Sequence, residues 1–392
     1  MSGQAHGAEL AGLYLHVPFC ATICPYCDFA VARGDARSSE LFTAALIAEA
    51  AAASTRFRGP FDTVYLGGGT PSLLPPDQLE SILSAVLARL AVASDAFVIM
   101  EANPEDVTSD SVAAWRALGV RGVSLGVQSF DARLLRFLGR GHSGAEARRA
   151  VELALAAGFD WVSLDLIYGA PAETWDPLVT ALADIDVAIA LAPHHVSCYQ
   201  LTVHEGTPFG AARDRGRLRE LAEDSQATIF LAVHDALDAG GYPAYEVSNF
   251  ARGPEHRSRH NTKYWRHVPY LGLGPSAHSF DGANRWWNLR DWRQWAHAVE
   301  GGAGARAGSE VLSALDLALE ALLLGLRTAD GIDLDRFATR YGVDLLAGNG
   351  KIVARAAADG LLLLESRRLR PTTRGMAVAD ALAASFELAS RS

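Results

Sequence analysis

Three cysteines near the start of the chain have the spacing to hold a metal centre. Cys20, Cys24 and Cys27 follow one another as C-x3-C-x2-C. Three thiolates on one loop can bind one face of an iron–sulfur cluster and leave a fourth corner open for chemistry. Tyr26 supplies an aromatic cover for such a cluster. A structural zinc site is the alternative, but it normally takes four protein ligands, and the nearby His16 is expected at a strand edge.

Other residues that suit a ligand site lie at the ends of short apolar runs, and one lies inside such a run. The chain has a glycine-rich loop at Gly67–Pro71, an acid at Glu101, an amide at Gln128 and a carboxyl at Asp165 inside an apolar run. One such residue is expected as a satisfied polar group of a core. Several of them, together with the cysteine loop, indicate the mouth of a ligand site.

The elements that must position these residues alternate between strand and helix at a spacing of roughly thirty residues, which is typical of βα units and a parallel sheet. Both a doubly wound open sheet and a barrel fit, and both place ligands at the carboxyl ends of strands. The expected strands are Leu13–Val17, Thr63–Leu66, Phe97–Glu101, Gly122–Gln128, Trp161–Ile167 and Val196–Leu201. The expected helices are Ser39–Ser54, Pro76–Leu90, Ser109–Leu118, Ala145–Ala157 and Trp175–Ala190.

The second half of the chain is less regular. A helical insert is expected around Leu218–Ala239, and the aromatic tract Tyr242–Trp295 shows too little periodicity for regular elements. From about Leu312 the chain turns helical, with a turn at Gly342 and then a hairpin, as in a winged-helix domain. DNA binding would be the specific interpretation of that domain. A structural role is favoured, because the sequence shows no basic recognition helix.

Composition excludes several classes of protein. The chain has 392 residues, 49% hydrophobic and 20% charged, with a formal charge of -10. An ordered globular protein is expected, without nucleic-acid binding or membrane insertion. Four cysteines cannot form a disulfide scaffold, no secretory signal is evident, and apolar stretches such as Ala314–Leu326 are too short to span a bilayer. We expect a cytoplasmic protein with reduced thiols, and a buried Cys198.

The stretch LYLHVPFCATICPYCDF resembles the cluster signature of the radical S-adenosylmethionine (radical SAM) superfamily. This resemblance implies that Cys20, Cys24 and Cys27 hold a [4Fe-4S] cluster whose fourth iron binds S-adenosylmethionine. In such proteins the cofactor carries the reactivity, and the protein positions it and excludes water.

Further motifs are similar to those of the HemW haem chaperones, relatives of the oxygen-independent coproporphyrinogen III oxidases. They are GGGTPS, EANPE, LGVQSF, LGRGH, SLDLIYGAP, YEVSNFA and HNTKYW, and the similarity covers roughly residues 12 to 385. The resemblance implies an incomplete (β/α)6 barrel with a smaller, mainly helical C-terminal domain. It divides the chain into a tail at 1–11, a barrel core at 12–240, a connecting region at 241–311 and a C-terminal domain at 312–392.

The same resemblance implies the cofactor pocket residue by residue. The cofactor-binding positions carried over are Tyr14, Tyr26, Gly68, Gly69, Thr70, Glu101, Gln128, Arg140 and Asp165. In the oxidase relatives the last three line the site of a second S-adenosylmethionine. A structural ion pair between Arg140 and Asp165 is the alternative role for those two residues, because a carboxylate buried alone is costly.

Two features separate the possible functions. The oxidases carry a further cysteine two residues after the third cluster cysteine, and this chain has Phe29 there. His260 begins HNTKYW, which matches the haem-associated HNxxYW motif, and an imidazole is a natural axial ligand of haem iron. Arg257, Arg259 and Arg266 suit the propionates of haem, or they solvate the loop.

The function predicted from these features is a haem chaperone that passes haem to an acceptor protein. The resemblance suggests respiratory haem proteins at the membrane as acceptors. The alternative is a radical SAM oxidoreductase that acts on a tetrapyrrole, although coproporphyrinogen oxidation is not expected with Phe29 in place of the cysteine.

Overall fold

Six parallel strands form the centre of a twelve-stranded sheet in the computed structural model, which describes residues 9–57, 59–171 and 174–388. Residues 1–8 of the predicted tail lie outside these ranges. The six strands are β1 (Ala11–Val17), β2 (Phe61–Gly68), β3 (Val92–Ala102), β4 (Gly122–Gln128), β5 (Trp161–Tyr168) and β6 (His195–Gln200). They lie side by side in chain order. A doubly wound sheet would reverse its order, so the alternative of an open doubly wound sheet is excluded and the core is a partial barrel.

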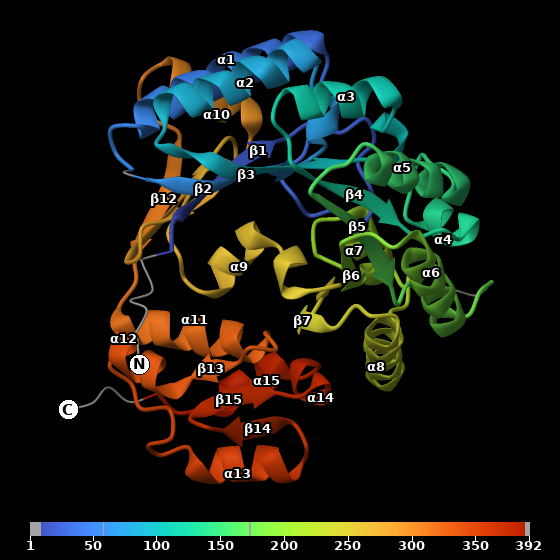
Figure 1. Cartoon of the computed structure of the whole chain (residues 1–392), viewed down its shortest axis with the longest axis vertical. Helices are drawn as coiled ribbons and strands as arrows, with labels where there is room; N and C mark the ends of the chain where they lie inside the picture. The colour runs from blue at the N-terminus through green and yellow to red at the C-terminus, as the bar shows by residue number, and fades with distance from the viewer. Residues whose placement is uncertain (1–8, 58, 172–173, 389–392) are drawn as a thin grey trace.

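Helices cover the outer face of this barrel (Figure 1). They are α1 (Ala36–Ala53), α2 (Pro76–Arg89), α3 (Ser109–Ala117), α4 (Ala132–Phe137), α5 (Gly144–Ala156) and α6 (Pro177–Leu191), with the 3-10 turns η1 (Pro71–Leu73) and η2 (Pro104–Asp106) between them. Local signals set their starts: the Asp35 side chain accepts from the Ser38 amide, and Ser143 and Glu146 form a capping box. The short α4 was not predicted.

The barrel is not closed, because further strands extend the sheet beyond β1 and β6. The elements that follow β6 are α7 (Pro208–Asp214), α8 (Glu223–Ala239), β7 (Ala244–Glu246), β8 (Asn249–Ala251), η3 (Pro254–His256), α9 (Arg259–Trp265), β9 (Tyr270–Leu273), β10 (His278–Phe280), β11 (Asn284–Asn288), α10 (Trp292–Glu300) and β12 (Arg306–Val311). Strand β8 pairs with β6, and β9 pairs in parallel with β1.

The expectation that the tract Tyr242–Trp295 lacks regular elements is wrong. Strands β7 to β11 have three to five residues each. Strands this short show no readable alternation, and their pairing defines them. Strands β9 and β8 pair with β1 and β6, which come much earlier in the chain, while β10 and β7 pair with β9 and β8, and β11 pairs with β10. Helix α9, which contains HNTKYW, lies in the opening of the barrel below β1 to β3 in Figure 1 and contacts β1, β2 and α11 (Ala314–Leu326).

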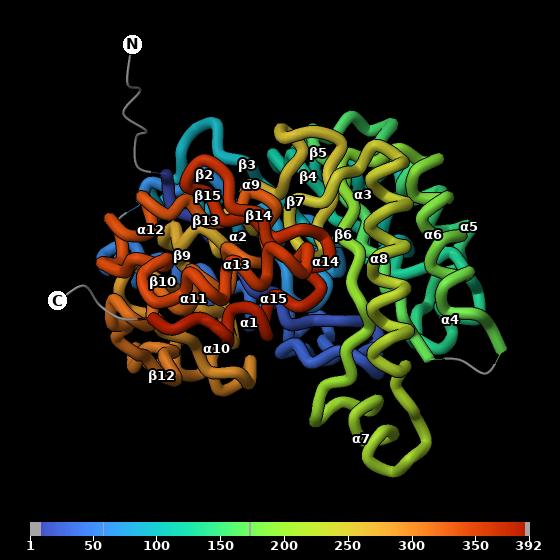
Figure 2. The backbone as a smooth tube through the Cα atoms, turned by 90° about the horizontal axis from the view of Figure 1, so that it is seen from below, coloured from blue at the N-terminus to red at the C-terminus, as the bar shows by residue number. Residues whose placement is uncertain are grey.

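The C-terminal segment forms a smaller unit with its own core. After α11 it consists of β13 (Ile332–Asp333), α12 (Leu334–Tyr341), α13 (Gly350–Ala358), β14 (Leu362–Glu365), β15 (Arg368–Pro371), α14 (Thr373–Met376) and α15 (Ala379–Ser385). The strands form a small sheet in the order β13-β15-β14, and Leu322, Leu326 and Leu362 in its core are fully buried. Figure 2, which looks from below, shows this unit in front of the part of the barrel that contains β2, β9 and α9, and away from the helices α4 to α6. Within the described ranges, no helix is long and apolar enough to cross a bilayer.

Candidate functional site

The three cysteines lie on the loop that follows β1. The Cys27 amide donates to the Cys24 carbonyl at 3.1 Å, and the Cys20 amide donates to Ala32 at 3.0 Å, so both ends of the loop are held by backbone bonds. All three thiols are free, and Cys24 is buried. Burial raises the pKa of Cys20 to about 11, and burial also raises the pKa of Cys27. These two thiols are therefore protonated at neutral pH, and a metal centre bound to them would displace their protons.

The glycine-rich loop after β2 packs directly against the cysteine loop. The Gly69 amide donates to Val17 at 2.6 Å, and the Thr70 amide donates to Phe19 at 2.7 Å. A Cβ on Gly69 would lie 2.7 Å from the Phe19 carbonyl oxygen, so a side chain at this position would push the two loops apart. The Thr70 hydroxyl lies 3.6 Å from the Cys20 sulfur. The glycines therefore have a packing role in addition to the predicted approach to a ligand.

Arg140 connects the cysteine loop to the ends of β3 and β4. Its Nη1 lies 3.5 Å from the Cys24 sulfur, and its Nη2 donates to the Asn103 side chain at 2.6 Å and to the Gly126 carbonyl at 2.8 Å. Its Nε is buried without a hydrogen-bond partner in the part of the chain that the structure describes. A buried cation with a spare donor beside a thiol suits an anionic group at this position.

Two carboxyl groups face the inside of the barrel. Glu101 accepts from the Tyr65 hydroxyl at 2.8 Å and from the Gly68 amide at 3.0 Å. Burial raises the pKa of Glu101 to about 7 and that of Asp165 to about 6. Asp165 accepts from Ser124 at 3.1 Å. Because both acids are destabilised in their charged forms, both suit a ligand that brings positive charge or hydroxyl donors.

The alternative of an ion pair between Arg140 and Asp165 is wrong for this structure. Among the described residues Asp165 forms no salt bridge; its carboxyl interacts with the Ser124 and Ser197 hydroxyls, and the charge of Arg140 acts on it only at longer range. Gln128, at the end of β4, has a φ of 64°. This left-handed conformation is uncommon for a residue other than glycine and is compatible with the predicted ligand role.

His260 lies inside the barrel opening, whereas we expected it on a loop. It is 1% exposed in helix α9. Its Nδ1 is 2.9 Å from the Thr63 hydroxyl on β2, and its Nε2 is 2.8 Å from the Tyr264 hydroxyl. Burial lowers the pKa of His260 to about 3, so the imidazole is neutral. In this arrangement both ring nitrogens already have partners.

A cavity of about 390 Å³ joins several of the predicted residues. Tyr14, Gly68 and Glu101 line it, together with Phe29 and Tyr264. Phe29 is 62% exposed. The structure thus brings one residue of the HNTKYW helix and the residue that replaces the oxidase cysteine to the same space as three predicted S-adenosylmethionine positions. Tyr26 lies apart from this cavity, where its ring contacts Phe209 at a centroid distance of 6.4 Å.

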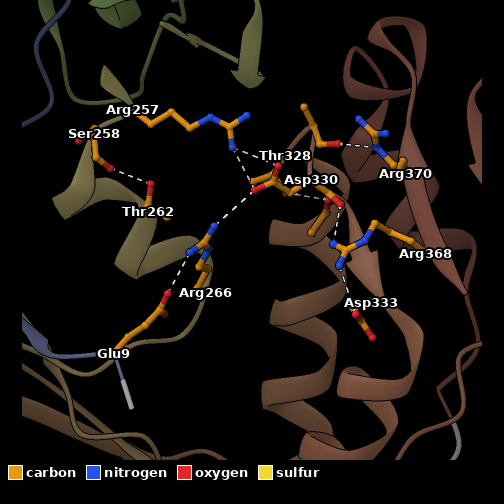
Figure 3. Close-up of polar contacts among 12 residues, drawn as sticks. Glu9, Arg257, Ser258, Thr262, Arg266, Thr328, Asp330, Asp333, Arg368 and Arg370 are labelled. Carbon is orange, nitrogen blue, oxygen red and sulfur yellow. Dashed lines mark hydrogen bonds and ion pairs between the residues drawn. The ribbon is translucent and has the colours of Figure 1, made fainter. Parts of the chain in front are cut away.

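A larger cleft of about 630 Å³ separates helix α9 from the C-terminal unit. Arg257 and Arg266 both approach Asp330 there, at 3.1 Å and 3.4 Å (Figure 3). Arg259 instead pairs with Asp62 at 3.2 Å. The three arginines predicted to meet haem propionates are therefore split between two places, and each has a carboxylate partner within the protein.

Comparison with known proteins identifies the family. The model of the radical SAM superfamily matches residues 14–185, and the model of the HemN C-terminal domain matches residues 312–378. A protein of Mycobacterium tuberculosis named "Heme chaperone HemW" is 40% identical over 375 residues, which cover 95% of this chain and 93% of that protein. The chain belongs to the HemW family of radical SAM proteins.

Other members of the HemW family and its relatives are similar over two thirds of the chain or more. The Escherichia coli "Heme chaperone HemW" is 38% identical over 275 residues, 68% of this chain and 69% of that protein. The mouse "Radical S-adenosyl methionine domain-containing protein 1, mitochondrial" is 34% identical over 390 residues, 95% of this chain and 86% of that protein. The solved coproporphyrinogen III oxidase HemN of Escherichia coli covers 96% of this chain and 90% of its own with a TM-score of 0.82. Its identity of 21% supports the shared fold alone.

The residues of this HemW-family chain suit the cluster and S-adenosylmethionine that the superfamily implies. The spare Nε of Arg140 and the uncompensated acids Glu101 and Asp165 fit a cofactor that carries both carboxylate and cationic groups. No three His, Cys, Asp or Glu side chains of the described ranges converge on one ion. An iron–sulfur cubane instead binds each thiolate at a different iron.

Two residues of this site were missed from the sequence. Asn103 donates to Thr70 at 3.3 Å and accepts from Arg140, and Tyr65 holds Glu101. Asn103 belongs to the motif EANPE, which could have indicated it. Tyr264 of HNTKYW, a candidate from the sequence for packing on a porphyrin, lines the cavity. No sequence signal distinguishes Tyr65 from the other tyrosines of a buried strand.

Proposed function

We propose that the chain is a haem chaperone that binds haem and transfers it to an acceptor protein. The observation that carries this proposal is similarity over nearly the whole chain to relatives named "Heme chaperone HemW", at 40% identity over 95% of the chain for the protein of Mycobacterium tuberculosis. Within it we assign residues 12–240 to the barrel core, 241–311 to the connecting region and 312–392 to the C-terminal domain. We place the protein in the cytoplasm, where its thiols stay reduced.

Cys20, Cys24 and Cys27 are proposed to hold a [4Fe-4S] cluster with an exchangeable S-adenosylmethionine. The chemistry that this pair supplies when bound is one-electron reduction of the sulfonium. The chain's own residues would position and shield it. Thr70 and Arg140 would donate to the thiolate sulfurs, since their donors lie 3.6 Å and 3.5 Å from two of them. Glu101 would accept from the ribose or pair with the amine, and Tyr14, Gln128 and Asp165 would complete the pocket.

Phe29 favours the chaperone over a radical SAM oxidoreductase that acts on a tetrapyrrole. Its phenyl ring lines the cavity beside the predicted cofactor positions, where the resemblance gives the oxidases a cysteine. A phenyl ring can neither donate a hydrogen atom nor take up a proton as a thiol can, so thiol chemistry is not available at this position.

The proposal is tested with full-length protein reconstituted without oxygen. Haem titration should give a saturable shift of the Soret band, and the loaded protein should transfer haem to apomyoglobin as a model acceptor. Incubation with coproporphyrinogen III, reductant and S-adenosylmethionine should give no protoporphyrinogen. Absence of haem binding would remove the chaperone function, and sustained production of protoporphyrinogen would establish the oxidoreductase instead.

A further inference from the structure

The burial of His260 raises the question of which imidazole can reach haem iron. A ligand must offer a nitrogen lone pair to the metal. One nitrogen of His260 contacts Thr63 and the other contacts Tyr264, within a helix that packs on two strands of the barrel. Iron binding at His260 would break one of these bonds and would also move α9 away from the barrel, because the ring is 1% exposed.

Two cavities meet beside α9 and offer another histidine. The cavity of about 390 Å³ described above shares Tyr264, Tyr270 and His278 with a second cavity of about 470 Å³. The second cavity is lined by aromatic and aliphatic side chains, among them Trp287 and Leu323, and by the ion-paired side chains of Arg285, Glu310 and Glu320. Leu323 belongs to α11, so this space lies between the extended sheet and the C-terminal unit.

Three histidines line these two cavities, and two of them are already engaged. The His16 ring contacts the Tyr14 hydroxyl at 3.0 Å and the Ala30 carbonyl at 2.9 Å. The His267 Nδ1 contacts the Tyr341 hydroxyl at 3.2 Å, and its Nε2, which makes no hydrogen bond to a described residue, is buried 3.5 Å from Glu320. Neither ring offers an accessible nitrogen to a ligand, since His16 is 6% and His267 4% exposed.

His278 is the third, and its ring nitrogens are free. It is an exposed residue at the start of β10, and no hydrogen bond or ion pair reaches its ring within the described ranges. The ring stacks on Trp287 of β11, directly across the strand pair, with centroids 5.7 Å apart and an interplanar angle of 24°. This contact fixes the orientation of the imidazole without using either nitrogen.

The charges around His278 favour its metal-binding form. Partial burial and the charge of Arg285 lower the pKa of His278, and the Glu310 carboxylate opposes them. The imidazole is therefore neutral at pH 7, which is the form that ligates iron. Arg285 itself is held by Glu320 and Glu310, so it is not free for another anion.

The surroundings fit a planar apolar ligand that carries carboxylates. The combined space holds the rings of Tyr264, Tyr270, Phe280 and Trp287. On the side of the cysteine loop it also contains Arg290, whose guanidinium donates to the Asp28 carbonyl at 2.6 Å and forms no salt bridge with a described residue. Each cavity lies in the size range of small-molecule sites, about 300–1,000 Å³. An aromatic wall, one free imidazole and one unpaired cation together match a metalloporphyrin with propionate groups.

We propose that His278 is an axial ligand of haem iron and that haem lies in the space shared by these two cavities, beside the S-adenosylmethionine positions. The inference rests on the proposed haem-binding function and names its ligand. His260 then has a positioning role: through Thr63 and Tyr264 it holds α9 against the barrel and shapes the wall of the haem space.

The test is a titration of ferric haem into anaerobically reconstituted, full-length protein, followed by the Soret band and by electron paramagnetic resonance. His278→Ala should weaken haem binding at least about tenfold and change the spin-state signal of the ferric iron. His297→Ala is the matched control, since it removes another exposed histidine, at the end of α10, that lines neither cavity, and it should leave both signals unchanged. Iron and sulfide content and the melting temperature show that each variant is folded.

A second variant tests ligation directly. In His278→Gly, added imidazole should restore the wild-type spectrum, which a merely structural loss would not allow. If wild-type protein binds haem and His278→Ala gives the same affinity and spectra, His278 is not the ligand while the proposed function stands. If wild-type protein itself fails to bind haem, the proposed function fails and this inference fails with it.

Discussion

Ionisation of Glu101 is expected to control the affinity for S-adenosylmethionine. The carboxyl is buried at the end of β3, and desolvation raises its pKa to about 7, with a smaller contribution from the charge of Asp165. A neutral acid binds the hydroxyls and the cationic groups of the ligand less well than a carboxylate does. Affinity should therefore increase as the pH rises through 7, the direction expected for a carboxyl that must lose its proton.

The size of the effect follows from that pKa. With a pKa of about 7, roughly one-eleventh of the Glu101 side chains are ionised at pH 6 and ten-elevenths at pH 8. If only the ionised form binds, the dissociation constant falls about tenfold between these two pH values. The amine of the ligand titrates near 8 and contributes its own slope, so the measurement needs a variant in which position 101 does not titrate.

Equilibrium dialysis of labelled S-adenosylmethionine against reconstituted protein between pH 5.5 and 8.5 provides the assay. Glu101→Gln should lower the affinity and leave only the pH dependence that comes from the amine of the ligand. Tyr65→Phe removes a hydrogen bond that lowers the pKa of Glu101, so its midpoint should move to higher pH by about one unit. Asp165→Asn is the control for the second acid. Its affinity should still increase with pH, with the midpoint moved slightly to lower pH. A wild-type profile that matches that of Glu101→Gln would refute this role for Glu101.

Three further predictions concern the cysteine loop, the glycine-rich loop and the domain contact. Anaerobic reconstitution of the wild-type protein should give roughly four irons and four sulfides per chain. Cys24→Ala should lose this iron and sulfide, whereas the control Cys198→Ala should keep them. Zinc without sulfide in the wild-type protein would exclude the cluster. Gly68→Ala should lose S-adenosylmethionine binding and melt at a lower temperature, because φ is +107° and the new Cβ would lie 2.5 Å from the His16 ring. The control Gly216→Ala, at φ +69° with open space around it, measures the cost of the backbone conformation alone. Equal losses of stability and of binding in the two variants would contradict this prediction. Asp330→Asn should lower the free energy of unfolding in urea by about 1 kcal/mol or less, because Asp330 is 46% exposed, and the difference from wild type should disappear in 1 M salt. A loss of several kcal/mol would show that the pairs of Asp330 with Arg257 and Arg266 stabilise the fold more than exposed ion pairs usually do.

The local features of this protein could be predicted from its sequence. The βα alternation placed the six central strands to within a few residues, except at the start of β3, which begins five residues before the expected Phe97. Residues at strand ends, such as Glu101, were recognised as unusual because a buried parallel strand rarely contains an unpaired acid. The family resemblance added the partial barrel, which periodicity alone could not separate from an open sheet.

The long-range contacts were decided by the tertiary structure alone. His260 and Thr63 are 197 residues apart, and their contact places in the interior a histidine that the lack of periodicity in its tract suggested was on a loop. His278 could not be recognised as a ligand candidate from the sequence, because the pairing of β10 with β11 places its ring on Trp287 and leaves its nitrogens free. Sequence spacing fixes which residues share a strand or a turn, but the exposure of a side chain and its hydrogen-bond partners depend on segments that meet only when the whole chain folds.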